Sequence, residues 1–523
     1  MLLSFESSPC KITEAFAYRN WMAAQQEGFN RVSTGIMSLD KILRGGLPAG
    51  ELYVVNGAPG SGKTTLALHF LQAGVQAGEK VLCLALSQRV DSLKQTARSV
   101  GIDVSRMTLR DSSTIRALQA ITIRQTVFDT SEVELSQTMQ ALTEVIETEQ
   151  PKRVVFDGIP YLRMLSNDPL TYRHQIFMLR DYMAERSITV LLTDTEELVP
   201  GDNELVAMAH GVISLSVGMT RHGSDHRYLR VSKIRGSDYE PGKHDMEISD
   251  WGVQVYRSHR AIPILSSLIP RQQNPICSSG LPALDKLVGG GLLAGTTCLL
   301  VGPSGTGKTS LATTFVHSFA QQGSKASIYL FDELADTFIQ RSAGLGMDVE
   351  QLIEQDRIRL HELSFGTITP GKFAYLVEQD LEEWGTGMVV IDTLTGYLNS
   401  MPSETRLIAQ MHELMMRLNR QGILTFLVVA QHGVVAPTLE VPVDVSYLAD
   451  TVLLLRHFEA EGMLRQAVSV YKKRYGPHEK GIRELKLQPG SIQIGSPLNQ
   501  FTGILSGTPR YLGEQRNLIG EDD

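Results

Sequence analysis

Short apolar runs alternate along this chain with longer segments in which apolar residues recur at the period of a helix. LYVVNG (52–57) and TCLLVG (297–302) are β-rich runs, and each precedes a glycine-rich loop and a helical segment that ends near glycine. Further runs of the same kind are VVFDG (154–158), TVLLTDT (189–195), MVVIDT (388–393) and TFLVVAQHG (425–433). Strands that alternate with helices form parallel sheets, so the pattern predicts an α/β fold with helices on both faces of a mostly parallel sheet.

The whole pattern occurs twice. Residues 34–86 align with residues 279–331 without a gap, so the repeat unit is a whole domain rather than a solenoid turn. A chain of 523 residues also exceeds what one core accommodates. We predict four parts, which are an N-terminal domain (1–258), a linker (259–274) within the stretch RSHRAIPILSSLIPRQQNP (257–275), a C-terminal domain (275–497) and a tail (498–523).

Composition narrows the function classes. With 42% hydrophobic and 20% charged residues, the chain is typical of a soluble globular protein. A net charge of −8 argues against a surface that coats nucleic acid, although it leaves room for a local basic patch. The N-terminus lacks the basic region of a signal peptide, and no apolar run is long enough to span a membrane. The four cysteines form no CxxC pair, so we expect a cytoplasmic protein in a reducing compartment.

Two loops match the pattern GxxxxGK[ST], GAPGSGKTT (57–65) and GPSGTGKTS (302–310), between a strand and a helix as the pattern requires. Glycines let successive backbone N–H groups converge on a phosphate chain, and the helix N-terminus adds partial positive charge. A glycine turn alone would explain neither lysine, so we predict two sites for a nucleoside triphosphate. The predicted nucleotide-binding residues are Gly57, Gly60, Gly62, Lys63, Thr64, Thr65, Gly302, Gly305, Gly307, Lys308, Thr309 and Ser310.

An aspartate ends an apolar run beyond each loop. Asp157 and Asp392 stand where a carboxylate can hold the water shell of Mg²⁺, while Thr64 and Thr309 offer their hydroxyls to the ion. The alternative is an aspartate that caps the next turn. Because a phosphate loop is present in each half, the metal role is favoured, and these four residues are the predicted Mg²⁺ residues.

The two halves differ where a catalytic base is expected. Asp332 lies 24 residues after Lys308 and is followed by Glu333, whereas Ser87 lies 24 residues after Lys63 and is followed by Gln88. Carboxylates at the end of a strand can orient and deprotonate an attacking oxygen, so Glu333, Asp332 and Lys308 are the predicted catalytic residues. The alternative is a pair of solvated carboxylates. A glutamine can still position water, as it does in some GTPases.

A basic cluster follows a β-rich run late in each half. SKIRGS (232–237) and YKKRYG (471–476) can supply cations from a neighbouring subunit that neutralise a γ-phosphate. The alternative is the exposed basic end of a surface strand.

The motifs together resemble the KaiC family, the tandem RecA-like ATPases related to the cyanobacterial clock protein. The resemblance covers residues from about Phe29 to about Leu512. It is carried by the TG…LD opening motifs, both phosphate loops, the acidic pair and the KxRG-type segments. VSYLADTVLLLRHFEAEGMLRQAVSVYKKRYGPHEKGIRELKL (445–487) and FTGILSGTPRYLG (501–513) add to it.

The resemblance implies two RecA-like domains and a homohexameric double ring with ATP at the subunit interfaces. It implies an N-terminal ring that is mainly an ATPase and a C-terminal ring that phosphorylates its own chain, hence a protein serine/threonine autokinase. Residues in both halves match those that reach the γ-phosphate of the neighbour, namely Lys233, Arg235, Lys472 and Arg474. The family's acceptors are an adjacent Ser-Thr pair, and the matching positions here are Ser446 and Tyr447. Only the serine acceptor is therefore retained.

Apart from Tyr447, the chain departs from the family in three places. Where the family carries Glu-Glu in both halves, this chain has Ser87-Gln88 and Asp332-Glu333. Asp332 is one methylene shorter than the expected glutamate. In the second basic cluster Tyr475 replaces a glycine, and Lys473 is a candidate substitute donor.

Three hypotheses follow. The leading one is a KaiC-like ATPase and autokinase in which the N-terminal half chiefly binds ATP for ring assembly. The second is a RecA- or DnaB-like motor on DNA, against which stand the acidic balance and the lack of a basic, aromatic-rich strand-binding loop. The third is a nucleotide-gated scaffold whose state is detected by a signalling partner such as a histidine kinase or a response regulator.

Overall fold

The computed structural model describes residues 30–113, 130–166, 169–195, 204–219, 225–258, 275–364, 368–399, 404–431, 446–505 and 509–512. The chain divides into two compact units, the first ending at Ser258 and the second containing the described residues from Pro275 onward. The linker predicted over 259–274 lies outside the described residues, as do most residues of the tail after 505.

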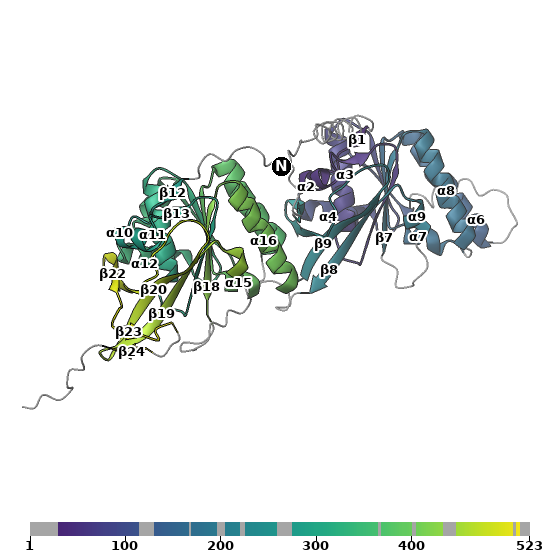
Figure 1. Cartoon of the computed structure of the whole chain (residues 1–523). Coiled ribbons are helices and arrows are strands. Elements are labelled where there is room, and N and C mark those ends of the chain that lie inside the picture. Colours follow the sequence, from purple (N-terminus) through teal and green to yellow (C-terminus); the bar gives the residue numbers. More distant parts are fainter. Residues whose placement is uncertain are drawn as a thin grey trace, which may run out of the picture. The chain divides into compact units, whose positions relative to one another are not determined.

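Nine strands form the sheet of the first unit (Figure 1). In spatial order they are β11 (Gly252–Tyr256), β10 (His244–Ser249), β9 (Asp225–Ile234), β8 (Gly211–Met219), β3 (Leu52–Gly57), β7 (Thr189–Thr195), β6 (Arg153–Asp157), β4 (Val81–Ala85) and β5 (Thr108–Asp111). From β8 to β5 the pairs are parallel, and β9, β10 and β11 form antiparallel pairs. The C-terminal ends of β3, β6 and β4 therefore lie at one edge of the sheet.

Helices cover both faces of this sheet (Figure 1). One layer contains α2 (Met37–Ile42), α3 (Lys63–Gln76) and α4 (Val90–Ser99). The other contains α6 (Thr130–Glu149), α7 (Pro160–Met164), α8 (Pro169–Glu185) and α9 (Glu204–Met208). Two short strands, β1 (Arg31–Val32) and β2 (Leu47–Pro48), pair beside the first layer.

The second unit repeats this topology strand for strand. Its sheet order is β16 (Ile358–Glu362), β15 (Ala326–Leu330), β17 (Met388–Asp392), β18 (Leu424–Ala430), β14 (Thr297–Gly302), β19 (Thr451–Ala460), β20 (Met463–Lys473), β21 (Arg483–Gln488) and β22 (Ser491–Pro497). The pairs from β16 to β19 are parallel and the later ones antiparallel.

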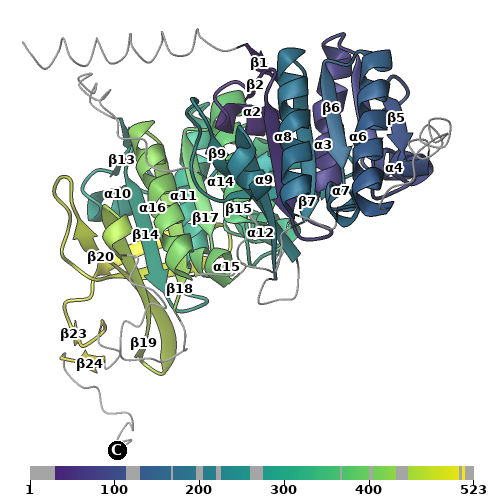
Figure 2. The same cartoon turned by 90° about the vertical axis from the view of Figure 1, so that its right-hand side faces the viewer.

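Its helices again form two layers. One layer includes the helix that follows the phosphate loop, and it contains α10 (Pro282–Leu287), α11 (Lys308–Gln321), α12 (Ala335–Gly344) and α13 (Val349–Glu354). The opposite layer contains α14 (Pro370–Gln379), the π-helix η1 (Asp380–Trp384), α15 (Leu394–Asn399) and α16 (Glu404–Arg420). The remaining elements are β12 (Ile276–Cys277), β13 (Leu292–Leu293), the 3-10 turn η2 (Ser446–Leu448), β23 (Phe501–Thr502) and β24 (Arg510–Tyr511). Figure 2 shows β23 and β24 beside β19 and β20.

The central parallel strands are mostly apolar because both of their faces are buried. In β3, Tyr53 and Val55 pack into the layer of α3, whereas Leu52 and Val54 pack into the layer of α8. The predicted fold class is confirmed, since each unit is a mostly parallel sheet with helices on both faces. The antiparallel strands that extend each sheet were not predicted as separate elements. Within the described residues, no helix combines the length and apolarity that a membrane crossing requires.

The TG…LD opening motif has the same internal bonding in both units. Asp40 accepts hydrogen bonds from the hydroxyls of Ser33 and Thr34, and from the backbone N–H of Thr34 at 2.8 Å. Asp285 accepts the same set from Ser278 and Ser279, again with a backbone bond of 2.8 Å. In each unit the aspartate therefore connects the turn before the helix to the helix itself. We call Ser33, Thr34 and Asp40, and their counterparts in the second unit, the structural clasp of the opening motif.

Candidate nucleotide sites

Both phosphate loops connect the end of a central strand to the start of a buried helix. The loop glycines have positive φ at Gly60 (76°), Gly62 (101°), Gly305 (78°) and Gly307 (90°), where an L side chain is strained. A Cβ on Gly57 or on Gly302 would also lie 2.4 Å from a carbonyl oxygen of the neighbouring strand. These backbones therefore require glycine, and they bring the loop's N–H groups to the N-terminus of α3 or α11.

The two loop lysines lie inside their loops. Lys63 Nζ donates hydrogen bonds to the carbonyl oxygens of Gly57 (2.7 Å) and Ala58 (2.9 Å), and Lys308 Nζ donates to that of Pro303 (2.7 Å). Burial lowers the pKa of both, that of Lys308 to about 8, against the opposing effect of nearby aspartates. A partly desolvated ammonium attracts an anion strongly, which suits a phosphate chain.

Asp157 is the meeting point of the first site. Its carboxylate is buried and accepts hydrogen bonds from the hydroxyls of Thr64 (3.1 Å) and Thr193 (2.8 Å). The side-chain amide of Gln88 also donates to it, at 2.9 Å. The structure therefore brings together Thr64 and Asp157, two of the predicted Mg²⁺ residues, and adds Thr193, which sequence analysis did not single out.

Asp392 occupies the matching place in the second site but has different neighbours. Burial raises the pKa of Asp392 to about 6, a hydrogen bond with Thr309 opposes this, and the charge of Glu333 adds to it. Among the described residues, its Oδ2 is buried without a hydrogen-bond partner. A buried, underbonded carboxylate beside a threonine hydroxyl fits a divalent cation that also binds phosphate oxygens.

The acidic pair of the second half lies just beyond the end of β15. Thr393 donates its hydroxyl to Asp332, and Arg341 on α12 forms an ion pair with Glu333. In the first half Ser87 packs against Gly158, the residue after Asp157. Positions 87–88 lie near Asp157 and positions 332–333 lie near Asp392, the equivalent aspartate of the second unit. The first half has a hydroxyl and an amide at these positions, and the second half has two carboxylates.

The basic clusters lie far from the phosphate loop of their own unit. In the first unit the backbone N–H of Arg235 donates to His210, whose own N–H donates to Leu52 at the start of β3. In the second unit Arg474 donates to Asp450, and Asp450 donates to Thr297 at the start of β14. The loops follow the opposite ends of these strands, five residues on and roughly 16 Å away. At this distance the cluster cannot contact a phosphate bound in the loop of its own unit.

The cluster side chains are held by equivalent contacts in both units. Lys233 donates to the carbonyl oxygens of Val206 and Ala207, and Arg235 to that of Ala207. Lys472 donates to the carbonyl oxygen of Ala449, and Arg474 lies 3.4 Å from the carboxylate of Asp450. In both units the arginine is exposed and the lysine half-buried.

Lys473 does not join this cluster. Its ammonium donates to the carbonyl oxygens of Val288, Gly291 and Pro477 on the other side of the strand. Lys473, the candidate substitute donor considered from the sequence, is therefore engaged away from Lys472 and Arg474. Tyr475 is exposed.

The proposed phosphoacceptor segment lies beside the second basic cluster. Ser446 and Tyr447 are in η2, directly before Ala449 and Asp450, which contact Lys472 and Arg474. Tyr447 is exposed, and its ring lies 5.9 Å from that of His412. The described structure thus places this segment at the same edge of the unit as the cluster.

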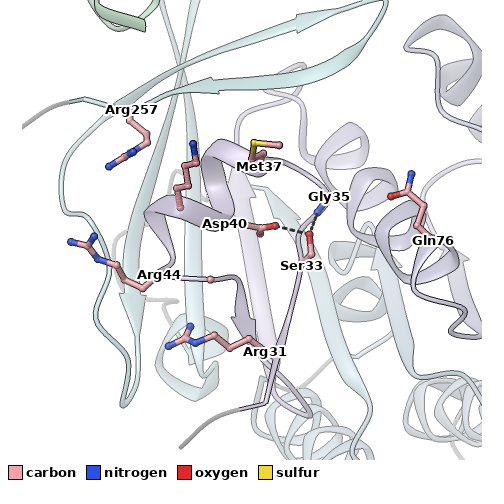
Figure 3. Close-up of a pocket in the computed structure, with 10 residues that line it drawn as sticks. Arg31, Ser33, Gly35, Met37, Asp40, Arg44, Gln76 and Arg257 are labelled. Carbon is pink, nitrogen blue, oxygen red and sulfur yellow. Dashed lines mark hydrogen bonds between the residues drawn. The ribbon is translucent and has the colours of Figure 1, made fainter. Parts of the chain in front are cut away.

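A separate cavity of about 740 Å³ opens beside α2 in the first unit (Figure 3). Its arginines are already engaged, since Arg44 and Arg257 pair with Glu240 and Arg31 bonds to Ser237 and to backbone carbonyls. Asp40 and Ser33, also in its wall, belong to the structural clasp of the opening motif. Neither phosphate loop lines it, so it is distinct from the nucleotide site.

The fold and the two loops define a class, the tandem P-loop nucleotide-binding proteins of RecA-like architecture. A family model described as the KaiC ATPase matches residues 32–260 and again residues 277–499. The chain therefore belongs to the KaiC ATPase family.

Curated relatives are similar over almost the whole chain. The circadian clock protein KaiC3 of Synechocystis sp. is 23% identical over 503 residues, which are 94% of this chain and 96% of that protein. The circadian clock oscillator protein KaiC of Acaryochloris marina is 25% identical over 503 residues, 93% of each chain. That of Synechococcus elongatus is 23% identical over 496 residues, again 93% of each.

Proposed function

We propose that this protein is a KaiC-like ATPase in which the second domain hydrolyses ATP and phosphorylates its own chain, while the first chiefly binds ATP for ring assembly. The observation that carries the proposal is the contrast beside the strand-end aspartates. Gln88 donates its amide to Asp157, whereas Glu333 is a carboxylate close enough to Asp392 to raise its pKa. Both halves have a phosphate loop with its lysine and threonine, but at the matched positions 87–88 and 332–333 only the second half has carboxylates that can take a proton.

The chemistry proposed for the second site is phosphoryl transfer to water or to a hydroxyl. Lys308 and the loop N–H groups hold the phosphates, and Mg²⁺ bound through Thr309 and Asp392 would supply positive charge to them. Glu333 accepts the proton of the attacking oxygen as that oxygen bonds to the γ-phosphorus. The bond from this phosphorus to the bridging oxygen breaks, and ADP leaves. Asp332, oriented by Thr393, is the second candidate base.

The acceptor proposed for the kinase reaction is Ser446 of a neighbouring copy of the chain. It lies in the segment next to Lys472 and Arg474, and this cluster is roughly 16 Å from its own loop. The backbone segment that carries Ser446 and the two cations lie at one edge of the unit, an arrangement suited to the phosphate loop of the next chain. A closed ring of six copies is the assembly that supplies every loop with such a neighbour.

Mass spectrometry of the purified protein after incubation with ATP and Mg²⁺ tests the kinase part. We expect a phosphate on Ser446 in the unmodified chain and none in Lys308→Ala, while Lys63→Ala retains phosphorylation if it still assembles. Phosphorylation that survives Lys308→Ala, or that requires an active first site in an assembled ring, would overturn the proposal.

A further inference from the structure

The helix after the acidic pair carries an arginine that the first half lacks. The two halves correspond residue by residue here, since α4 (Val90–Ser99) matches α12 (Ala335–Gly344) with the same offset of 245 residues that relates Lys63 to Lys308. With that offset Gln88 matches Glu333 and Thr96 matches Arg341. One half therefore has two neutral side chains where the other has an ion pair.

The contacts explain why the two differences occur together. In the first site the Gln88 amide is a donor to Asp157, so the two side chains attract each other and need no counter-charge. In the second site Glu333 and Asp392 repel each other, and two nearby carboxylates in a partly buried place are costly unless a cation lies beside them. Arg341 pairs with Glu333, whose side chain is 20% exposed, and its charge also acts on Asp392.

The guanidinium is well suited to hold the carboxylate. It lies over the ring of Phe338, a fully buried residue of α12, so its position is set by packing. Among the described residues, its Nε and Nη2 are buried and have no hydrogen-bond partner. These two unused donors allow the guanidinium to remain hydrogen-bonded to Glu333 when the carboxylate rotates.

We propose that Arg341 is a positioning residue that holds Glu333 beside Asp392 and so makes the second site competent for turnover. The inference rests on the proposed function of Glu333 as the base. Arg341 acts through Glu333, and its removal leaves the phosphate loop intact. The expected signature is a loss of kcat without a matching change in KM for ATP.

Steady-state ATPase and autophosphorylation of the full chain test this with Arg341→Thr, which installs the first-half residue. We expect kcat to fall roughly 10- to 100-fold, because a misplaced base costs about that much, while KM for ATP stays within about twofold. Arg341→Lys should recover part of the loss, and Gln340→Ala, an exposed neighbour on the same helix, should leave both constants unchanged. Full turnover in Arg341→Thr alongside loss of turnover in Glu333→Gln would overturn the inference and leave the proposed function standing. Full turnover in Glu333→Gln would overturn both.

The reciprocal exchange in the first half gives a readout that does not depend on activity. Gln88→Glu alone places a second carboxylate against Asp157 and should lower the unfolding temperature of the nucleotide-free protein. Adding Thr96→Arg should restore it, whereas Thr96→Ala should not. If the double variant Gln88→Glu/Thr96→Arg is no more stable than Gln88→Glu, the inference that a glutamate at this position requires the arginine is wrong.

Discussion

At the scale of single residues, the two sites differ in how their strand-end aspartate is satisfied. Asp157 accepts hydrogen bonds from Thr64, Gln88 and Thr193, so its buried charge is stabilised by the protein itself. Asp392 has a buried oxygen without a partner among the described residues, and burial raises its pKa to about 6. The negative charge of Asp392 is thus incompletely stabilised by the protein, and a cation bound with a nucleotide can stabilise it.

This incomplete stabilisation predicts the behaviour of Asp392→Asn. Since the folded pKa is above the ordinary value of 3.8, folding favours the protonated carboxyl, and ionisation destabilises the wild type. We expect the nucleotide-free variant to be more stable by roughly 2 kcal/mol at pH 8. The difference should grow between about pH 4 and about pH 6 and be small below that window. Chemical unfolding of both proteins at several pH values measures it, and a variant that is less stable at pH 8 would contradict the assignment.

The residues that the sequence could not assign are those whose role depends on contacts between distant segments. The phosphate loops and the strand-end aspartates follow from local pattern, because a strand, a glycine loop and a helix are neighbours in the chain. Thr193 gains its role by contact with Asp157, 36 positions away. Arg341 is close in sequence to its partner Glu333, but its charge also acts on Asp392, 51 positions further along the chain. A comparison of the halves position by position, extended from Gln88 and Glu333 along the next helix, would have detected Arg341.

At the scale of elements, an ion-pair network fixes the π-helix η1 to the edge of the second sheet. Asp380 accepts from Tyr329 Oη (2.7 Å) and Arg359 Nη1 (3.0 Å), and His361 Nε2 lies 2.7 Å from it. Burial alone would raise the pKa of Asp380, but these hydrogen bonds hold it down at about 2. The ring of Tyr329 also stacks on that of His361. The carboxylate therefore connects β15, β16 and η1.

Asp380→Asn should weaken this connection. A folded pKa below the ordinary 3.8 means that the ionised carboxylate stabilises the fold above about pH 4, and that this contribution disappears as the pH falls towards 2. We expect a loss of about 2 kcal/mol in the free energy of unfolding at pH 7, narrowing in acid. Glu354→Gln, an exposed carboxylate on α13, is the control and should cost almost nothing. Equal stability of Asp380→Asn and wild type at pH 7 would show that the network is not stabilising.

Pattern alone predicted the central parallel strands of each sheet, but not the outer parallel strands β5, β8, β16 and β19. Parallel strands such as β3 and β14 are buried on both faces and therefore appear as continuous apolar runs. Strands such as β9 and β20 have mixed burial along their length, so charged residues interrupt their apolar positions. Their sequences look β-rich but do not indicate where they lie in the sheet. The basic clusters at their ends were noticed, but their distance from the loop of their own chain depends on sheet order.

At the scale of the whole molecule, the proposed action of these clusters on a neighbouring copy can be tested. If Lys472 and Arg474 serve the phosphate loop of the next copy, two inactive chains should complement each other when mixed. Equimolar Lys308→Ala and Arg474→Ala chains form one interface in four with an intact loop and an intact arginine. We expect such mixtures to recover up to about a quarter of wild-type turnover after subunit exchange. Mixing each variant with itself provides the control, and no recovery in exchanged rings would contradict action between copies.

The central claim is a division of labour, in which the first domain holds nucleotide and the second consumes it. The most direct measurement compares ATP turnover of Glu333→Gln with that of Gln88→Ala in protein whose assembly with ATP is unchanged. The account predicts that Glu333→Gln loses about 100-fold or more in kcat, whereas Gln88→Ala stays close to wild type. Loss of turnover in Gln88→Ala together with its retention in Glu333→Gln would contradict the account.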